Sequence, residues 1–125
     1  MARLEEIVVD AQRPAALARF WAAALDGYAV RPYDAEEMAR LARAGFTPET
    51  DPAVAVDGDG PTLFFQQAAT TNAGRNRIHF DVACTSRSRE VARLERLGAR
   101  VREVHASYTV MLDPEGNAFC VQGEA

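Results

Sequence analysis

The chain has 125 residues, of which 48% are hydrophobic and 26% charged, and this is the size and composition of one ordinary globular domain. Its formal net charge of −4, and the lack of any apolar run near the ~20 residues that a membrane helix needs, argue against nucleic acid and membrane as partners. The first residues lack the apolar core of a signal peptide, and two cysteines, Cys84 and Cys120, are too few for a disulfide scaffold, so we expect a cytoplasmic protein with reduced thiols.

A strand and then a helix are predicted near the N-terminus. Residues 4–10 alternate in hydrophobicity, as a half-buried strand does. Residues 14–25 then show helical spacing, and the helix opens on a proline, which fits the first helical position because its missing N–H has no partner there. Phe20 and Trp21 lie on the apolar side and are interpreted as core. Asp10, at the end of the strand, is interpreted as a cap for this helix.

A short strand over residues 28–31 and a second helix over residues 34–45 are predicted next. Asp34 with Glu37 three positions later is a variant of the capping box, and Gly45 ends the helix. No counterpart of this helix occurs later in the chain. We therefore interpret it as an insertion.

A hairpin closes the first half of the chain. Two predicted strands, residues 53–56 and 62–67, flank the sequence Asp-Gly-Asp-Gly at residues 57–60, which is typical of a tight turn. Residues 47–52 carry two prolines and are expected to form a loop. The small, polar stretch 68–74 is predicted to join the two halves.

The second half repeats this order without the insertion. A strand over residues 77–83 is followed by a helix over residues 87–97, whose Val91, Leu94 and Leu97 are expected to face inward. A strand over residues 99–104 follows. His105 comes next and is interpreted as a solvated loop residue.

The chain ends in a second predicted hairpin, with strands over residues 108–112 and 118–122. Its turn, Asp-Pro-Glu-Gly-Asn at residues 113–117, has a proline that fixes φ, and a glycine and an asparagine that tolerate positive φ.

Both halves therefore have the order β-α-β-β-β, so an internal repeat is the strongest signal in the chain. Glu6 and His79 take equivalent places in the first strands of the two halves, and a pseudo-two-fold axis would relate them. We predict a single domain over residues 1–125, made of module one at about 3–67 with its inserted helix at about 34–45, and module two at about 76–123.

Several stretches resemble the vicinal oxygen chelate superfamily, which has the glyoxalase/bleomycin-resistance/dioxygenase fold, and within it a glyoxalase-like subgroup found widely in actinobacteria. They are residues 16–25, Asn76-Arg-Ile-His-Phe-Asp-Val, Leu97-Gly-Ala, Val110-Met-Leu-Asp-Pro-Glu-Gly-Asn-Ala-Phe-Cys-Val, and Gly45-Phe-Thr-Pro after the inserted helix. The resemblance implies an α+β fold in which two tandem βαβββ modules form a curved mixed sheet around a central cavity. In enzymes of the superfamily, four His and Glu side chains hold a divalent metal in that cavity.

Mapped onto this chain, the four-ligand pattern is incomplete. Glu6 and His79 stand where the first strand of each module offers a ligand. Counting from the turn glycines places Cys120 where the superfamily usually has glutamate, and places Phe64, which has no donor atom, at the matching position of module one. Gln66 would be a weak replacement. The sequence therefore predicts no complete set of metal ligands, and a divalent Zn, Ni, Mn or Fe ion stays open as an alternative.

Strand alternation gives the side chains expected to line the cavity. This set is Glu6, Val8, Thr62, Phe64, Gln66, His79, Asp81, Ala118, Cys120 and Gln122. From it we predict Glu6, Phe64, Gln66, His79, Asp81 and Cys120 as ligand-binding residues. A mixed polar and aromatic lining suits a small organic molecule.

Three functions remain open. The first is a small-molecule binding protein without the complete metal site, similar to resistance proteins that sequester a drug, and a homodimer is then expected. The second is a lyase, isomerase or dioxygenase that uses His79 and Glu6 as metal ligands or as an acid–base pair, because a histidine beside a carboxylate is a reasonable general base. The third is a structural or protein-interaction module.

Overall fold

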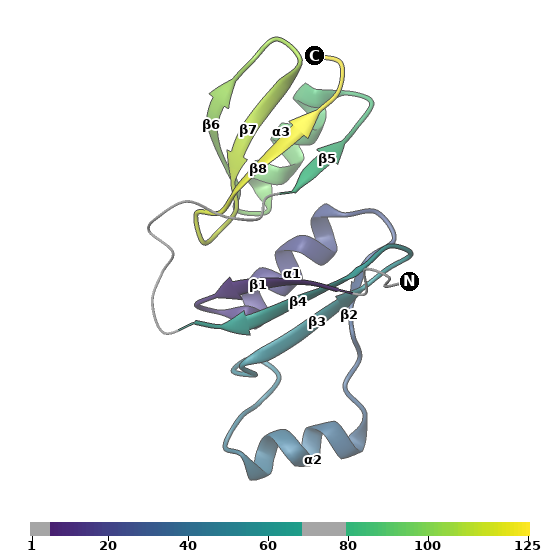
Figure 1. Ribbon diagram of the computed structural model, residues 1–125, viewed down its shortest axis with the longest axis vertical. Helices are drawn as coiled ribbons and strands as arrows, with labels where there is room; N and C mark the ends of the chain where they lie inside the picture. Colours follow the sequence, from purple (N-terminus) through teal and green to yellow (C-terminus); the bar gives the residue numbers. More distant parts are fainter. Residues whose placement is uncertain (1–5, 69–79) are drawn as a thin grey trace, which may run out of the picture. The chain divides into compact units, whose positions relative to one another are not determined.

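The protein, represented by a computed structural model, is described for residues 6–68 and 80–125, the side chain of Asp81 excepted (Figure 1). It forms two compact units, residues 1–71 and 72–125. The first contains β1 (Glu6–Ala11), α1 (Pro14–Ala24), β2 (Ala29–Val30), α2 (Ala35–Arg43), β3 (Ala53–Asp57) and β4 (Thr62–Gln67). The second contains β5 (Asp81–Ala83), α3 (Arg87–Arg96), β6 (Arg100–Val104), β7 (Tyr108–Leu112) and β8 (Ala118–Gln122).

Each unit holds one four-stranded mixed sheet, and the two sheets have the same topology. Sheet A has the order β1-β4-β3-β2 and sheet B the order β5-β8-β7-β6. In each, the first strand of the unit runs parallel to the last, and the other neighbours are antiparallel. The predicted α+β fold with two tandem βαβββ modules and one inserted helix is therefore confirmed.

In the first unit, α1 packs against one face of sheet A and leaves the other face without a helix. Leu63 and Phe65 of β4 are buried on the α1 side, together with Val56 of β3. Trp21 is 1% exposed, and its ring meets that of Phe20 edge-on at 5.1 Å, as a core aromatic pair does. The interpretation of these two aromatic residues as core is confirmed.

The inserted helix α2 begins after Asp34, as the sequence predicts, and ends at Arg43, two residues before the predicted end. The Asp34 carboxylate accepts a hydrogen bond from the Glu37 backbone N–H at 2.8 Å, and Gly45 takes a positive φ of 85° just past the helix. Figure 1 shows α2 at the end of two connections that leave the sheet. Tyr33 anchors the first connection to the second, because its hydroxyl donates to the buried carboxylate of Asp51 at 2.7 Å.

The first hairpin has its glycines for a steric reason. Neither Gly58 nor Gly60 has a positive φ. Instead, a Cβ atom at Gly58 would lie 2.6 Å from the ring of Tyr28, and one at Gly60 would lie 2.6 Å from its hydroxyl. That hydroxyl donates to the Pro61 carbonyl at 3.0 Å. The tyrosine therefore lies over the turn, in space that only glycine leaves.

In the second unit, α3 covers sheet B over Met111, Phe119 and Val121, which are each at most 1% exposed. Leu94 faces this core, but the prediction that Leu97 does so is wrong, since Leu97 is 37% exposed. The helix ends at Arg96, and the chain then turns through Gly98, whose φ is 111°. Beyond the helix, Ala99 is buried in place of Leu97, and its backbone N–H donates to the carbonyl of Leu94.

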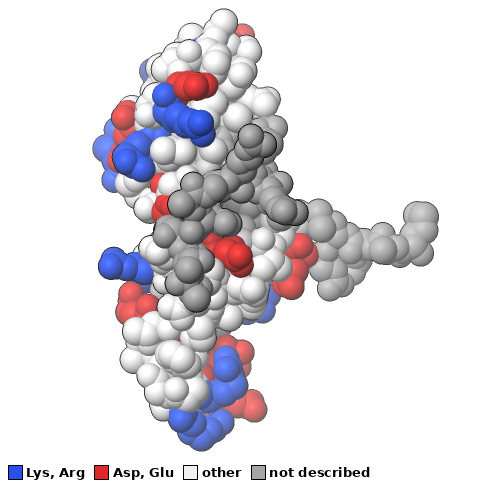
Figure 2. All heavy atoms as spheres, turned by 60° about the vertical axis from the view of Figure 1, so that its left-hand side comes forward, with Lys and Arg blue, Asp and Glu red and all other residues white. Residues whose placement is uncertain are grey.

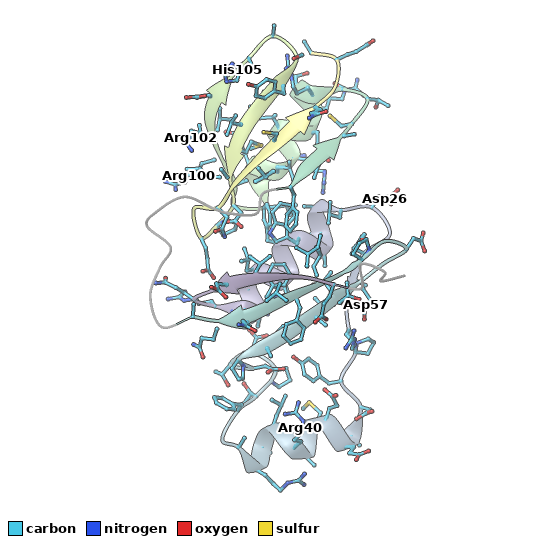
Figure 3. All side chains as sticks on the ribbon, in the orientation of Figure 1. Asp26, Arg40, Asp57, Arg100, Arg102 and His105 are labelled. Carbon is cyan, nitrogen blue, oxygen red and sulfur yellow. The ribbon has the colours of Figure 1, made fainter. Side chains whose placement is uncertain are left out.

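All five residues of the edge strand β6 are exposed. Arg100 and Arg102 project from it in Figure 3. In the neighbouring β7–β8 turn, Gly116 has a φ of 86°, as predicted, but Asn117 does not take a positive φ. Asn117 instead donates to the carboxylate of Asp113.

Acidic and basic side chains lie side by side on the helices α2 and α3. Figure 2 shows acidic and basic side chains next to each other at the lower end of the molecule, where α2 lies. Arg40 and Glu37 of that helix approach within 3.8 Å, and on α3 Arg93 binds Glu90 at 2.7 Å. No helix in the described part of the chain is long and apolar enough to cross a membrane.

Candidate functional site

The face of sheet A opposite α1 gathers most of the predicted site residues of module one. We call it the helix-free face. The register pairs Glu6 with Thr62, Val8 with Phe64, and Asp10 with Gln66, so these six side chains point to the same side. On β3, Ala55 pairs with Phe64 and Ala53 with Gln66, and they extend the face.

The first row of this face is polar and contains an ion pair. Asp57, next to Thr62, binds the guanidinium of Arg31 through both oxygens, at 2.7 and 3.0 Å. The Thr62 hydroxyl donates to the same carboxylate at 2.8 Å. Figure 3 labels Asp57 at this end of the sheet. Glu6 completes the row on β1.

These contacts set the ionisation of the pair. The hydrogen bond from Arg31, followed by that from Thr62, holds the pKa of Asp57 below its ordinary value. The hydrogen bond to Asp57 raises the pKa of Arg31, and the negative charges of Asp57, Glu37 and Glu6 add to this. At neutral pH the pair is therefore fully ionised.

The middle row is apolar. It runs from Val8 on β1 through Phe64 on β4 to Ala55 on β3. Val8 is 40% exposed, whereas Ala55 is only 8% exposed beside Arg31, whose backbone N–H bonds to its carbonyl. Phe64 is half-buried at the centre of the face. This row gives a ligand an apolar surface to rest on.

The third row is polar again, with Asp10, Gln66 and Ala53. The interpretation of Asp10 as a helix cap is wrong. The N-cap residue of α1 is Arg13, and no side chain caps that end of the helix. Asp10 lies within β1 with its side chain exposed on the helix-free face, because strand alternation places it on the same side as Val8.

Sheet B carries the equivalent face of module two. Val110 pairs with Cys120, Tyr108 with Gln122 and Leu112 with Ala118, all on the side opposite the buried Met111 and Phe119. Cys120 pairs with Asp81 as Phe64 pairs with Val8. Counting from the turn glycines had placed Cys120 and Phe64 at equivalent positions of the two modules. The strand pairing in both sheets agrees with this equivalence. His79 lies outside the described residues.

The donor atoms on these faces do not fit the four-ligand metal centre that the resemblance implies. Phe64 occupies one of the four ligand positions and offers no donor, and Cys120 replaces a second carboxylate with a half-buried thiol. Among residues 6–68 and 80–125, no group of three or more His, Cys, Asp or Glu side chains is placed to share a metal ion.

Two other features lie outside the set of predicted site residues. His105 is a surface residue, as predicted, with its ring stacked on Tyr108 at 4.4 Å and its Nε2 atom 3.1 Å from Glu103. A groove of about 600 Å³ runs along α3 and is lined by Cys84, Thr85, Ser86, Arg89, Glu90, Ala92, Arg93 and Arg96. Burial raises the pKa of the Cys84 thiol, so this thiol is protonated at neutral pH.

Sequence reasoning missed Arg31 and Asp57 as members of the site. Each stands at the edge of a predicted strand, where a charged residue is ordinarily solvated. Extending the alternation one residue past residues 53–56 would have placed Asp57 on the same face as Ala55. Alternation within the predicted strand over residues 28–31 would likewise have placed Arg31 on the face of Ala29, which pairs with Asp57.

Tandem βαβββ modules, each with a helix on one face of its sheet only, define the glyoxalase/bleomycin resistance/dioxygenase class of folds. This chain belongs to the glyoxalase-like domain family, whose model matches residues 6–122. The predicted superfamily is therefore confirmed, and the narrower actinobacterial subgroup stays a prediction. No curated protein has a significantly matching sequence.

Solved structures of related proteins match over nearly the whole chain. A glyoxalase/bleomycin resistance protein/dioxygenase family enzyme from Burkholderia phytofirmans has a TM-score of 0.66 at 14% identity, covering 99% of this chain and all of that one. The fosfomycin resistance protein FosX from Mesorhizobium loti has a TM-score of 0.67 at 12% identity, and the match covers 100% of this chain and 94% of FosX. The trypanothione-dependent glyoxalase I of Leishmania major has a TM-score of 0.63 at 16% identity, and the match covers 99% of this chain and 88% of that enzyme. At these identities the likeness shows the fold alone.

The ion pair on the helix-free face gives a pH-dependent prediction. Because the pKa of Asp57 is lowered in the folded state, the pair stabilises the protein above the ordinary pKa of an aspartate and ceases to do so as pH falls through the lowered value. Both side chains are about half exposed, so we expect Arg31→Met to lower the free energy of unfolding by less than about 1 kcal/mol at pH 7. Urea denaturation at a series of acidic pH values should show this difference shrinking and then vanishing once the pH is below the lowered pKa of Asp57. A difference that does not change with pH would contradict this role.

Proposed function

We propose that this protein binds a small organic molecule on the helix-free face of sheet A, with Phe64 as its central contact. The observation that carries the proposal is the position of Phe64 in the middle of the face, at the place where the resemblance implies a metal-binding carboxylate. An aromatic ring there offers a flat apolar surface and no donor to a metal. The cavity that the resemblance predicts between the modules, and the homodimer, are part of this proposal.

The composition of the face supports a small-molecule ligand. Binding sites for organic molecules combine an apolar floor with a few polar groups that fix orientation. The floor here is the row of Val8, Phe64 and Ala55. Hydrogen-bonding groups stand on either side, with Glu6 on one flank and Asp10 and Gln66 on the other. A partly apolar ligand with one or two polar groups matches this pattern.

A lyase, isomerase or dioxygenase with His79 and Glu6 as metal ligands or acid–base pair is the alternative. The missing donor at Phe64 weighs against its metal-dependent form, because metals of this group need several nitrogen and carboxylate ligands. We therefore derive no catalytic step through a metal. Elemental analysis of protein purified without added metal should find fewer than about 0.2 equivalents of Zn, Ni, Mn or Fe per chain. Stoichiometric metal would favour the alternative.

Binding can be tested with a neutral aromatic probe, 1-naphthalenemethanol, followed by fluorescence titration. We expect Phe64→Ala to weaken binding of this probe at least about tenfold, because the ring supplies the centre of the contact. Val104→Ala is the matched control, since this 72% exposed valine belongs to β6 of sheet B and not to the helix-free face, and its truncation should leave the affinity unchanged. Equal affinities of the unchanged protein and Phe64→Ala would contradict the proposed site, provided that both melt at similar temperatures.

A further inference from the structure

The charges on the helix-free face do not cancel. The described residues of the face include three carboxylates, of Glu6, Asp10 and Asp57, and one guanidinium, of Arg31. Both oxygens of Asp57 accept hydrogen bonds from the guanidinium of Arg31, so the charges of these two residues neutralise each other. Two negative charges, those of Glu6 and Asp10, are left.

Arg31 does not offer its charge to an anionic ligand. Its Nε atom lies 2.7 Å from one oxygen of Asp57 and one of its terminal nitrogens lies 3.0 Å from the other. This bidentate geometry is the strong form of an arginine–carboxylate pair. An anion could reach only the guanidinium N–H groups that Asp57 leaves open, and there the negative charge of Asp57 offsets the attraction of Arg31.

Glu6 and Asp10 stand on either side of the apolar row. They precede and follow Val8 by two residues on β1, which places their Cα atoms about 13 Å apart along the strand. Within residues 6–68 and 80–125, the structure shows no ion pair for either carboxylate. A molecule resting on Phe64 therefore has a carboxylate within reach at each end.

We infer that the ligand of this face is an organic cation, an aromatic or aliphatic body that carries a protonated amine. This inference rests on the proposed function and adds the chemical class of the ligand. The body rests on Val8 and Phe64, and the ammonium group lies against Glu6 or Asp10, where it gains a charge-assisted hydrogen bond. The ring of Phe64 also attracts a cation that lies over it. An anionic ligand of the same shape is repelled by both carboxylates.

The test compares three probes with the same ring system at pH 7: 1-naphthalenemethylamine, which is cationic, neutral 1-naphthalenemethanol, and anionic 1-naphthoate. In low salt we expect the amine to bind at least about fivefold more tightly than the alcohol, and the carboxylate more weakly than either. The double variant Glu6→Gln with Asp10→Asn should remove the preference for the amine, so that the amine and the alcohol bind to it with similar affinity. Glu36→Gln with Glu95→Gln is the matched control, because it removes two exposed charges from α2 and α3 and should retain the preference.

The outcomes separate this inference from the proposed function. If the alcohol binds and Phe64→Ala weakens it, but the three probes bind equally or the carboxylate binds best, the face is a binding site and the inference of a cation is wrong. If the amine is preferred but the preference survives the Glu6→Gln, Asp10→Asn variant, the inference is also wrong, since other charges select the ligand. If none of the three probes binds, both the inference and the proposed function are overturned.

Discussion

Replacing Asp113 with alanine should lower the free energy of unfolding by about 3 kcal/mol, because it removes a buried carboxylate that organises the β7–β8 turn. Asp113 is 1% exposed. One of its oxygens accepts the backbone N–H groups of Glu115 and Asn117, both at 2.9 Å, and the Asn117 side chain donates to both oxygens. The alanine variant leaves these donors without their acceptor. Urea denaturation at pH 7 measures the loss.

The first hairpin provides a control for this variant. Asp59 is also an aspartate in a β-hairpin turn, but it is exposed, so Asp59→Ala should change the free energy of unfolding by less than about 0.5 kcal/mol. Asp113→Asn keeps one acceptor oxygen and should recover part of the loss. A loss in Asp113→Ala no larger than that in Asp59→Ala would contradict this account of the turn.

Arg87→Met should be the next most damaging change, at about 2 kcal/mol, because it removes two charge-assisted hydrogen bonds. Although arginine is usually exposed, Arg87 is 6% exposed at the start of α3. Its guanidinium donates to the carbonyls of His105 at 3.0 Å and Ala106 at 2.8 Å. The side chain thus ties the β6–β7 loop to the helix. Thermal and urea unfolding of the variant measure the effect.

The neighbouring Arg89 separates this role from a general effect of charge. It is exposed on the same helix, so Arg89→Met should cost less than about 0.5 kcal/mol while changing the net charge by the same amount. Arg87→Lys keeps the charge but lacks the planar fork that reaches two carbonyls, and should recover only part of the stability. Equal stabilities of Arg87→Met and Arg89→Met would refute the role of the buried guanidinium.

Local signals in the sequence predicted the elements of the fold closely. Alternation and turn residues gave β4 at residues 62–67 and β8 at residues 118–122, which are the bounds in the structure. The capping pair Asp34 and Glu37 predicted the start of α2, and the same hydrogen bond is present. These signals depend on neighbours within a few residues, so they can be read along the chain.

Features that depend on distant residues were not predicted. The burial of Arg87 requires the carbonyls of the β6–β7 loop, about 18 residues later in the chain. The two glycines of the first turn are required by the side chain of Tyr28. This residue directly precedes β2 and lies about 30 residues before the turn in the sequence. Leu97 was misplaced because periodicity continued the helix one residue too far.

For the site, alternation alone placed Glu6, Phe64 and Gln66 on one face, because a strand has only two sides. It could not find the pairing of Arg31 with Asp57, since that pair joins two strands whose register depends on the whole sheet. Asp10 does not cap α1 as predicted. The register of β1 with β4 places it beside the apolar row, where its carboxylate adds to the negative charge of the helix-free face.

The most direct test of the central claim is the location of a bound ligand. Proton–nitrogen correlation spectra of the labelled protein, recorded with increasing 1-naphthalenemethanol, report which backbone amides sense the probe. Binding on the helix-free face predicts that the largest shifts occur at Val8, Ala55 and Phe64 and at their neighbours on β1, β3 and β4. Shifts confined to α1, or to the groove along α3, would contradict the account.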